Sequence, residues 1–380
     1  MRHEQIELRT EKNELTEDLT YMKRALTLAE RGAGWVNPNP MVGAVAVKEG
    51  RIIGEGYHEF FGGPHAEVNA LAGCQEGSAE GATLYVTLEP CSHTGKTPPC
   101  TDLILRHRIG RVVTAMEDPN PLVAGQGHKR LQEAGIEVVT GILEQQARAL
   151  NEAFIKFITT GRPWGVLKTA MTLDGKIATV TNASRWITGE SSRRIVHRMR
   201  GRMNAIMVGI NTVLTDDPRL NIRLKGNWKN PLKVIVDTRC RIPLTAAVLT
   251  TDPQLTLVAT TNLSEPARRK ELERLGAQVI VCPEAEGKVD LDYLAGALGQ
   301  MGIDSLLIEG GSTLAFSALQ AGIVDKVVSF VAARILGGAN APTPVGGPGI
   351  ETMEKAIELG PMKIKRIGND LMIEAQLTTH

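Results

Sequence analysis

Residues 64–67 read Pro-His-Ala-Glu, and residues 90–100 read Pro-Cys-Ser-His-Thr-Gly-Lys-Thr-Pro-Pro-Cys. One imidazole and two thiolates suit a tetrahedral zinc ion that keeps a fourth position for water. We therefore expect His65, Cys91 and Cys100 to bind zinc. Glu67 follows the histidine closely enough to reach that water without binding the metal, which makes it the candidate general acid and base.

The order H-x-E followed by P-C-x-x-C is the signature of zinc-dependent nucleobase deaminases. Bound zinc lowers the pKa of water to about 7, so the chemistry can run near neutral pH. The spacing departs from the signature because residues 92–99 separate the two cysteines. A longer loop can still bring both thiolates to one ion, since the entropic cost of closing a loop grows slowly with its length. The alternative is a histidine and two free cysteines that are simply buried.

Length and composition indicate an ordinary two-domain globular protein. The chain has 380 residues, of which 42% are hydrophobic and 22% charged, with a net charge of +1. Balanced charge provides no electrostatic argument for nucleic acid, and the sequence has no apolar run of transmembrane length. The charged N-terminus does not resemble a signal peptide. Five cysteines in this length do not indicate a disulfide framework, so we expect a cytoplasmic protein in which Cys74, Cys240 and Cys282 are buried or half-buried thiols.

Residues 17–160 are predicted to form the zinc deaminase domain, after an N-terminal extension at residues 1–16. Periodicity predicts helices at residues 17–31, 65–72, 101–107, 127–134 and 151–160, and strands at 41–47, 51–57, 83–88, 111–116 and 137–140. Alternating helices and strands predict an α/β layered domain. The metal ligands then fall at the starts of two helices, where the helix dipole favours thiolate.

Residues 161–380 are predicted to form a second α/β domain, which begins at a turn over residues 161–163. Strands are expected at residues 164–171, 205–209, 233–237, 255–260, 278–282, 305–309, 326–331 and 371–376, and a basic helix at 191–202. This pattern favours a doubly wound sheet with an antiparallel finish. The sequence has no G-x-G-x-x-G fingerprint. Residues 309–314 follow a strand and open a helix, so their backbone N–H groups could bind a phosphate, although a simple helix cap is the alternative.

The long loop between the cysteines resembles the RibD family of bifunctional riboflavin-biosynthesis enzymes, whereas simpler cytidine and tRNA adenosine deaminases have the short spacing. Residues 168–178 (KTAMTLDGKIA), 184–188 (SRWIT), 209–220 (GINTVLTDDPRL) and 309–311 (EGG) resemble the reductase half of that family. The resemblance extends over residues 17–375. It implies a cytidine-deaminase-like three-layer domain followed by a dihydrofolate-reductase-like α/β domain that uses NADPH.

The resemblance also implies site residues in both halves. In the first, substrate contacts fall on Asn39, His58, Lys96 and Asn120, with His93 and Asp118 as further candidates, and surface or loop-stabilising side chains as the alternative. In the second, substrate contacts fall on Ser184, Arg200, Leu220, Arg223 and Glu309. Cofactor contacts fall on Ala170, Trp186, Thr212, Asp216, Gly311, Ser312, Thr313, Leu314, Ala315, Phe316 and Ser317. Lys168 is the candidate catalytic proton donor, and His107 and His128 are expected at the surface.

Two successive reactions are implied. They are zinc-dependent deamination of 2,5-diamino-6-(5-phosphoribosylamino)pyrimidin-4-one and NADPH reduction of the ribosyl group of 5-amino-6-(5-phosphoribosylamino)uracil to ribityl. We expect zinc and NADPH as cofactors, a phosphorylated pyrimidine as the ligand and a homo-oligomeric assembly, with neither nucleic acid nor membrane as a partner.

Three other interpretations remain open from the sequence. One of the two domains could have lost its activity. A nucleic-acid deaminase would need a basic face with aromatic side chains, but aromatic residues are only 4% of the chain and its charge is balanced. A zinc-stabilised interaction scaffold would leave Glu67 without a role.

Overall fold

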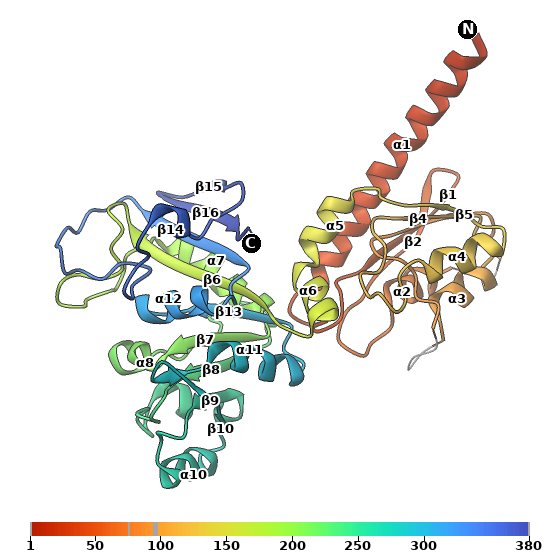
Figure 1. Ribbon diagram of the computed structural model, residues 1–380. Helices are drawn as coiled ribbons and strands as arrows, with labels where there is room; N and C mark the ends of the chain where they lie inside the picture. Colours follow the sequence, from red (N-terminus) through yellow and green to blue (C-terminus); the bar gives the residue numbers. More distant parts are fainter. Residues whose placement is uncertain (1, 75–76, 94–97, 379–380) are drawn as a thin grey trace. The chain divides into compact units, whose positions relative to one another are not determined.

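The computed structural model describes residues 2–74, 77–93 and 98–378, with side chains in the first helix from residue 14 onward, and it divides after Thr160 (Figure 1). Met1–Thr160 form the first unit and Gly161–His380 the second. Within the described ranges, no helix combines the length and the apolar character needed to cross a membrane.

The first unit is built on a five-stranded sheet in the order β2-β1-β3-β4-β5. The strands are β1 (Gly43–Lys48), β2 (Arg51–Tyr57), β3 (Thr83–Val86), β4 (Arg111–Thr114) and β5 (Glu137–Val139). Around it are α1 (Arg2–Ala29), η1 (Glu30–Gly32), α2 (Ala66–Leu71), α3 (Cys100–Arg106), α4 (Gln126–Glu133), α5 (Glu144–Leu150) and α6 (Glu152–Thr160). The pairs β1–β2 and β1–β3 are antiparallel, and β3–β4 and β4–β5 are parallel.

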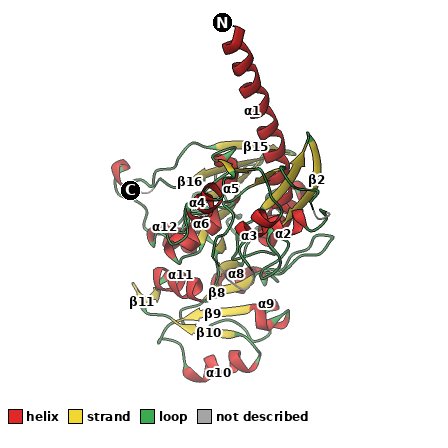
Figure 2. Cartoon of the chain, turned by 90° about the vertical axis from the view of Figure 1, so that its right-hand side faces the viewer, coloured by secondary structure: helices red, strands yellow, loops and turns green. Residues whose placement is uncertain are grey.

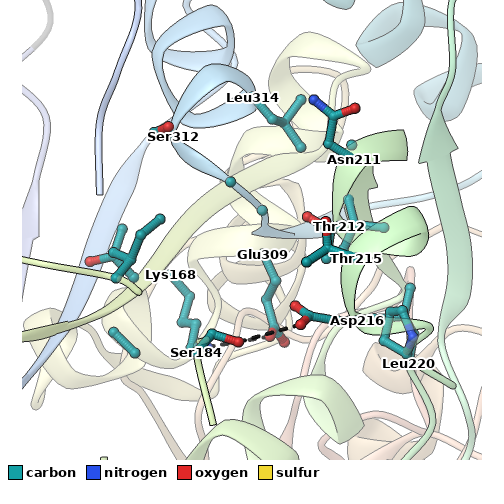
Figure 3. A pocket seen from close by; sticks show the side chains of 18 of the residues that line it. Lys168, Ser184, Asn211, Thr212, Thr215, Asp216, Leu220, Glu309, Ser312 and Leu314 are labelled. Carbon is teal, nitrogen blue, oxygen red and sulfur yellow. Dashed lines mark hydrogen bonds and ion pairs between the residues drawn. The ribbon is translucent and has the colours of Figure 1, made fainter. Parts of the chain in front are cut away.

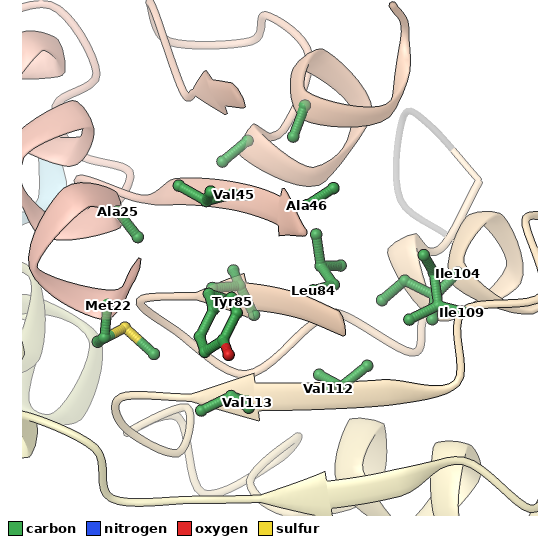
Figure 4. Close-up of a cluster of buried hydrophobic side chains, with 14 of the residues drawn as sticks. Met22, Ala25, Val45, Ala46, Leu84, Tyr85, Ile104, Ile109, Val112 and Val113 are labelled. Carbon is green, nitrogen blue, oxygen red and sulfur yellow. The ribbon is translucent and has the colours of Figure 1, made fainter. Parts of the chain in front are cut away.

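Helices pack on both faces of this sheet. Met22 and Ala25 of α1 lie on the face of Val45 and Tyr85, whereas Ile104 of α3 lies on the opposite face (Figure 4). Glycines in the strands permit this close packing: a Cβ on Gly43 would lie 2.0 Å from the carbonyl oxygen of Ala25, and one on Gly56 would lie 2.3 Å from the backbone nitrogen of Ala70. The layered α/β class predicted from the sequence is confirmed.

The second unit contains a nine-stranded sheet in the order β10-β9-β8-β7-β13-β6-β14-β16-β15. Its strands are β6 (Trp164–Thr172), β7 (Ala205–Gly209), β8 (Leu232–Val236), β9 (Thr256–Thr260), β10 (Gln278–Val281), β13 (Ser305–Glu309), β14 (Lys326–Ala332), β15 (Lys363–Ile367) and β16 (Asp370–Gln376). All neighbours from β10 to β14 are parallel, and β16 and β15 are added antiparallel. Figure 2 shows β8, β9 and β10 side by side. The predicted antiparallel finish is confirmed.

The connections of this second sheet are mostly helical. They are α7 (Glu190–Arg202), α8 (Ile210–Asp216), α9 (Ala247–Thr250), η2 (Pro253–Leu255), α10 (Pro266–Arg274), α11 (Leu291–Gln300), α12 (Ser312–Gln320) and η3 (Met353–Lys355), together with the small hairpin of β11 (Glu284–Ala285) and β12 (Lys288–Val289). The carboxyl ends of β6, β13, β7 and β8 therefore share one edge of the sheet. Crevices at such edges are the usual ligand sites of open parallel sheets.

Several predicted boundaries need correction. The first helix begins at Arg2 rather than Glu17, because the charged residues before Glu17 are good helix formers although they lack an apolar stripe. Helices α5 and α8 and strand β15 were not predicted. Strand β15 is mostly exposed at the end of the sheet and reads Lys-Ile-Lys-Arg-Ile, and such charged edges discourage pairing with other chains while hiding the strand signal.

A buried ion pair joins α1 to the sheet. Nη1 and Nη2 of Arg111 on β4 donate to the two carboxylate oxygens of Asp18 at 2.8 and 2.9 Å. The hydroxyl of Tyr85 on β3 donates to the same carboxylate at 2.9 Å. Asp18 is only 3% exposed, so water cannot easily replace a lost partner.

We predict that Asp18→Ala destabilises the first unit by about 3 kcal/mol, because Arg111 and Tyr85 lose a buried acceptor. The matched control is Glu144→Ala, which removes an exposed pair with Arg148 and should cost about 0.3–0.5 kcal/mol. Urea unfolding followed by circular dichroism measures both. Equal unfolding midpoints for the two variants would contradict this account of the ion pair.

Candidate functional site

Three donor atoms from separate segments meet in the first unit. His65 precedes α2, Cys91 lies in the loop after β3, and Cys100 begins α3. His65 Nδ1, Cys91 Sγ and Cys100 Sγ all lie within 4.8 Å of one another. The imidazole nitrogen is 3.3 Å from Cys100 Sγ and 3.6 Å from Cys91 Sγ. Around tetrahedral zinc with these ligands, donor atoms are about 3.5–3.8 Å apart, so the set fits zinc.

The electrostatics of the cluster also suit a cation. The Cys100 thiol is the main cause that lowers the pKa of Cys91 to about 4, with His65 acting in the same direction and burial opposing both. In turn, Cys91 and burial raise the pKa of Cys100. One thiolate is therefore favoured by the protein alone, and a dication would stabilise the second.

Glu67 lies in the first turn of α2, beside this cluster. It is 4% exposed, and burial raises the pKa of its carboxyl. The donor set for zinc and the carboxylate therefore occur together, as the sequence motif predicts.

His58 lies next to His65, with their ring centroids 5.8 Å apart, and is 3% exposed. Its Nδ1 lies 2.9 Å from the carbonyl oxygen of Pro64, and its Nε2 lies 3.1 Å from Nδ2 of Asn39. A carbonyl only accepts, so Nδ1 carries the hydrogen, and burial lowers the pKa of His58 and favours the neutral ring. Nε2 then accepts from the Asn39 amide. In this arrangement His58 orients Asn39, which turns its amide oxygen away from the ring.

The other candidate residues of the first unit differ in where they lie and in how exposed they are. Lys96 lies outside the described residues, and His93 is exposed. Asp118 and Asn120 share the loop after β4, where Asp118 accepts from the backbone N–H of Asn120 at 2.9 Å. The surface prediction for His128 is wrong: it is 7% exposed and its Nε2 lies 3.1 Å from Thr114 Oγ1. His107 is half-buried.

Glu89, which sequence analysis missed, ties this loop to the zinc ligands. One carboxylate oxygen accepts from the backbone N–H groups of Asp118 and Gly125 at 3.1 and 2.9 Å, and the other accepts from Gly127 and His128 at 2.7 and 3.3 Å. A Cβ at Gly127 would lie 2.0 Å from the carbonyl oxygen of Pro90. The first turn of α4 therefore packs directly on the segment that leads to Cys91. A single glutamate gives no periodic signal, so only the fold reveals this role.

We predict that Glu89→Gln destabilises the first unit by about 1–3 kcal/mol, because a side-chain NH₂ would face backbone N–H donors. Glu117→Gln is the matched control, since Glu117 lies close to Glu89 and His128 but is exposed. Its stability should stay within about 0.5 kcal/mol of the wild type. Thermal unfolding of both variants is the measurement, and an unchanged Glu89→Gln would show that the four hydrogen bonds contribute little.

The second unit contains a cavity of about 1030 Å³ at the shared edge of its parallel strands. The described lining includes Lys168 and all five residues predicted to contact substrate: Ser184, Arg200, Leu220, Arg223 and Glu309. Nine of the predicted cofactor residues line it as well: Ala170, Trp186, Thr212, Asp216, Gly311, Ser312, Thr313, Leu314 and Ser317. Figure 3 labels Thr212, Asp216, Ser312 and Leu314 among them. Its volume suits a large cofactor together with a substrate.

Two predicted cofactor residues do not line this cavity. Ala315 and Phe316 are 1% and 7% exposed. Ala315 packs in the hydrophobic core of the second unit, whereas Phe316 is covered by the loop at Gly347, where an added Cβ would lie 2.4 Å from its ring. Sequence analysis also missed several lining residues. Asn211 and Thr215 lie within the quoted stretch 209–220 but were not singled out, and Thr238, Arg241 and Lys288 lie outside every quoted stretch.

A buried charged group forms the middle of the cavity. Arg200 donates from Nε and Nη2 to the two carboxylate oxygens of Glu309 at 2.7 and 2.9 Å, and Lys168 Nζ lies 3.3 Å from the same carboxylate. Although burial opposes it, Arg200 and Lys168 lower the pKa of Glu309 to about 2. Two cations around one anion leave a net positive charge, which suits an anionic ligand.

Comparisons with known proteins match each of the two units to a family. Residues 15–116 match the family described as the cytidine and deoxycytidylate deaminase zinc-binding region, and residues 163–373 match the RibD C-terminal domain. The riboflavin biosynthesis protein RibD of Actinobacillus pleuropneumoniae is 47% identical over 94% of this chain and 94% of its own length. That of Escherichia coli is 40% identical over 94% of this chain and 98% of its own length.

Solved structures give the same result. Acinetobacter baumannii RibD is 39% identical, with a TM-score of 0.86, over 96% of this chain and 100% of that chain. A Thermotoga maritima protein named as a diaminohydroxyphosphoribosylaminopyrimidine deaminase/5-amino-6-(5-phosphoribosylamino)uracil reductase is 36% identical, with a TM-score of 0.84 and the same coverage. The chain therefore belongs to the RibD family of riboflavin biosynthesis proteins.

Proposed function

We propose that this protein catalyses two successive steps of riboflavin biosynthesis. The first deaminates 2,5-diamino-6-(5-phosphoribosylamino)pyrimidin-4-one with zinc, and the second reduces the ribosyl group of 5-amino-6-(5-phosphoribosylamino)uracil to ribityl with NADPH. One observation carries the proposal: a complete zinc donor set beside a buried glutamate and a cationic cavity at the edge of a parallel sheet occur in the same chain. Neither unit lacks its site, which disfavours an enzyme with a single activity.

In the first unit, His65, Cys91 and Cys100 would hold zinc, which when bound activates water at neutral pH. Glu67 takes a proton from the attacking water and passes it to the departing amino group. Asn39 contacts the edge of the pyrimidine through its amide, which His58 holds in place. Asn120 and Lys96 contact the ribose and phosphate.

In the second unit, NADPH supplies a hydride to C1′ of the ring-opened ribose when it is bound. Arg200 and Arg223, with Ser184 and Leu220, hold the phosphorylated substrate. The fork of Arg223 suits a phosphate, whereas Nε and Nη2 of Arg200 already donate to Glu309. Glu309 accepts a hydrogen bond from Arg200 and so fixes the position of its guanidinium group. Lys168, held at the cavity wall by Glu309, donates the proton that the nitrogen bound to C1′ takes up as the C–N double bond is reduced.

Two further expectations belong to this proposal. The thiols of Cys91 and Cys100 must stay reduced to bind zinc, which supports a cytoplasmic enzyme. A homo-oligomer remains a prediction, and light scattering during size-exclusion chromatography tests it.

We predict that Glu67→Gln lowers the rate of ammonia release about 10²–10⁴-fold, because the proton shuttle is lost. Zinc content, measured by plasma mass spectrometry, should stay the same. The second unit provides an internal control, since NADPH oxidation with 5-amino-6-(5-phosphoribosylamino)uracil should be unchanged. Full deaminase activity in this variant would instead favour a zinc-stabilised scaffold.

The reverse pattern is predicted for Lys168→Met. NADPH oxidation should fall about 10²-fold through kcat, because the proton donor is absent, whereas ammonia release should be unaffected. Lys363→Met is the control, because this exposed lysine lies on β15 and is not among the cavity residues. A loss confined to KM would remove Lys168 from the proton-transfer step.

A further inference from the structure

Helix α4 packs against both segments that carry the zinc-binding cysteines. Helices α3 and α4 lie side by side (Figure 1), and Cys100 begins α3. Gly127 of α4 is packed so closely on the segment before Cys91 that an added Cβ would lie 2.0 Å from the carbonyl oxygen of Pro90. Residues three positions apart share one face of a helix. Arg130, the next residue on this face, is therefore directed at the same segment.

Arg130 forms a bridge between the two segments. Its Nη1 donates to the carbonyl oxygen of Ser92, the residue after Cys91, at 3.3 Å. Its Nη2 lies 2.5 Å from Oδ1 of Asp102, which is in the first turn of α3. The planar guanidinium group presents several N–H donors in fixed directions, so it can hold both partners at once. One side chain thus connects the chain beyond the first cysteine to the helix that the second cysteine begins.

The spacing of the cysteines explains why such a bridge matters. In the C-x-x-C signature, the short chain between the thiols limits how far apart they can move. Here residues 92–99 separate the two cysteines, and a chain of that length can extend much further than the 4.8 Å within which the donor atoms lie. The backbone N–H of Cys100 donates to Cys91 Sγ at 3.3 Å, and that of Thr101 donates to the carbonyl oxygen of Cys91 at 3.2 Å. Arg130 adds a link between the residues beyond the two cysteines.

The exposure of the bridge indicates what it can contribute. The side chains of Arg130 and Asp102 are 43% and 36% exposed, and exposed ion pairs add little to the stability of a fold. The bridge should therefore affect how well the donor atoms are arranged for the metal more than whether the unit folds. The positive charge of Arg130 would by itself repel a dication. Charge and positioning therefore have opposite effects on zinc affinity, and an experiment can separate them.

We propose that Arg130 is a positioning residue for zinc. By joining Ser92 to Asp102, it holds the segments of Cys91 and Cys100 together and replaces the constraint that the short spacing supplies in C-x-x-C sites. This inference rests on the proposed zinc-dependent deamination, and it gives Arg130 no contact with the metal or the substrate.

The test uses the full-length protein in reducing buffer and compares Arg130→Met with Lys129→Met. Lys129 is the neighbouring exposed cation on α4, and its ion pair is with Glu133 at 3.9 Å, so the control removes the same charge and leaves the bridge intact. Competition with a chromophoric chelator measures the zinc dissociation constant. The absorption spectrum of the cobalt-loaded protein reports the thiolate ligands. Urea unfolding and NADPH oxidation verify that both units of each variant are folded.

Arg130→Met should weaken zinc binding about 5- to 10-fold. This is less than the 10- to 100-fold typical of groups that are bonded directly to a metal ligand, because Arg130 contacts residues beside the ligands. Lys129→Met should change zinc affinity less than about twofold. The cobalt spectrum of Arg130→Met should still show both thiolates. Ammonia release should return to wild-type rates at saturating zinc, because no group that reacts has been removed.

Two further variants test the bridge itself. Asp102→Asn should weaken zinc binding by a similar factor, and the double variant with Arg130→Met should be little worse than either single one, because both changes break the same link. Arg130→Lys should fall between Arg130→Met and the wild type, since it keeps the charge but loses the fork.

The proposal is overturned if Arg130→Met leaves zinc affinity unchanged or increases it, since tighter binding would mean that only the repulsive charge matters. It is also overturned if Lys129→Met has the same effect as Arg130→Met, or if saturating zinc fails to restore ammonia release. A wild-type protein that binds no zinc would instead refute the proposed deaminase function, which is a different result from a failure of the role of Arg130 alone.

Discussion

The chemistry of the first unit depends on bringing three donor atoms from separate segments within 4.8 Å of one another. His65 precedes one helix, Cys100 opens another, and Cys91 lies in a loop beyond a central strand. Two thiolates this close repel each other, and a bound dication offsets that repulsion. The sheet and its flanking helices supply the rigidity that this closeness requires.

Buried carboxylates do much of the remaining positioning, and each is satisfied by several donors. Asp18 accepts from Arg111 and Tyr85, and Glu89 accepts from four backbone N–H groups. Glu309 accepts from Arg200 and Lys168. A buried charge without partners would destabilise the fold. Here the donors come from segments distant in the sequence, so each carboxylate also holds those segments together.

The two units use different physics for their ligands. The first concentrates soft donors around one position, which suits a metal ion and a small reacting centre. The second spreads cationic groups along a cavity of about 1030 Å³, in which Arg200 and Lys168 share the carboxylate of Glu309. Hydride transfer needs placement more than acid–base chemistry, which explains why the reductase half has no conspicuous catalytic motif in its sequence.

The sequence alone was sufficient for the α/β class and for a doubly wound sheet with an antiparallel finish, because periodicity is a local property. It was also sufficient for the grouping of His65, Glu67, Cys91 and Cys100, because the chemistry of metal ligands is read from short motifs. The tertiary structure decided what depends on distant contacts. It buried His128, Ala315 and Phe316, and it placed His58 within hydrogen-bonding distance of Asn39. It also brought Glu89 to the first turn of α4 and Arg241 to the wall of the cavity. A side chain's partner is chosen by how strands and helices pack, and packing joins residues whose separation along the chain carries no signal.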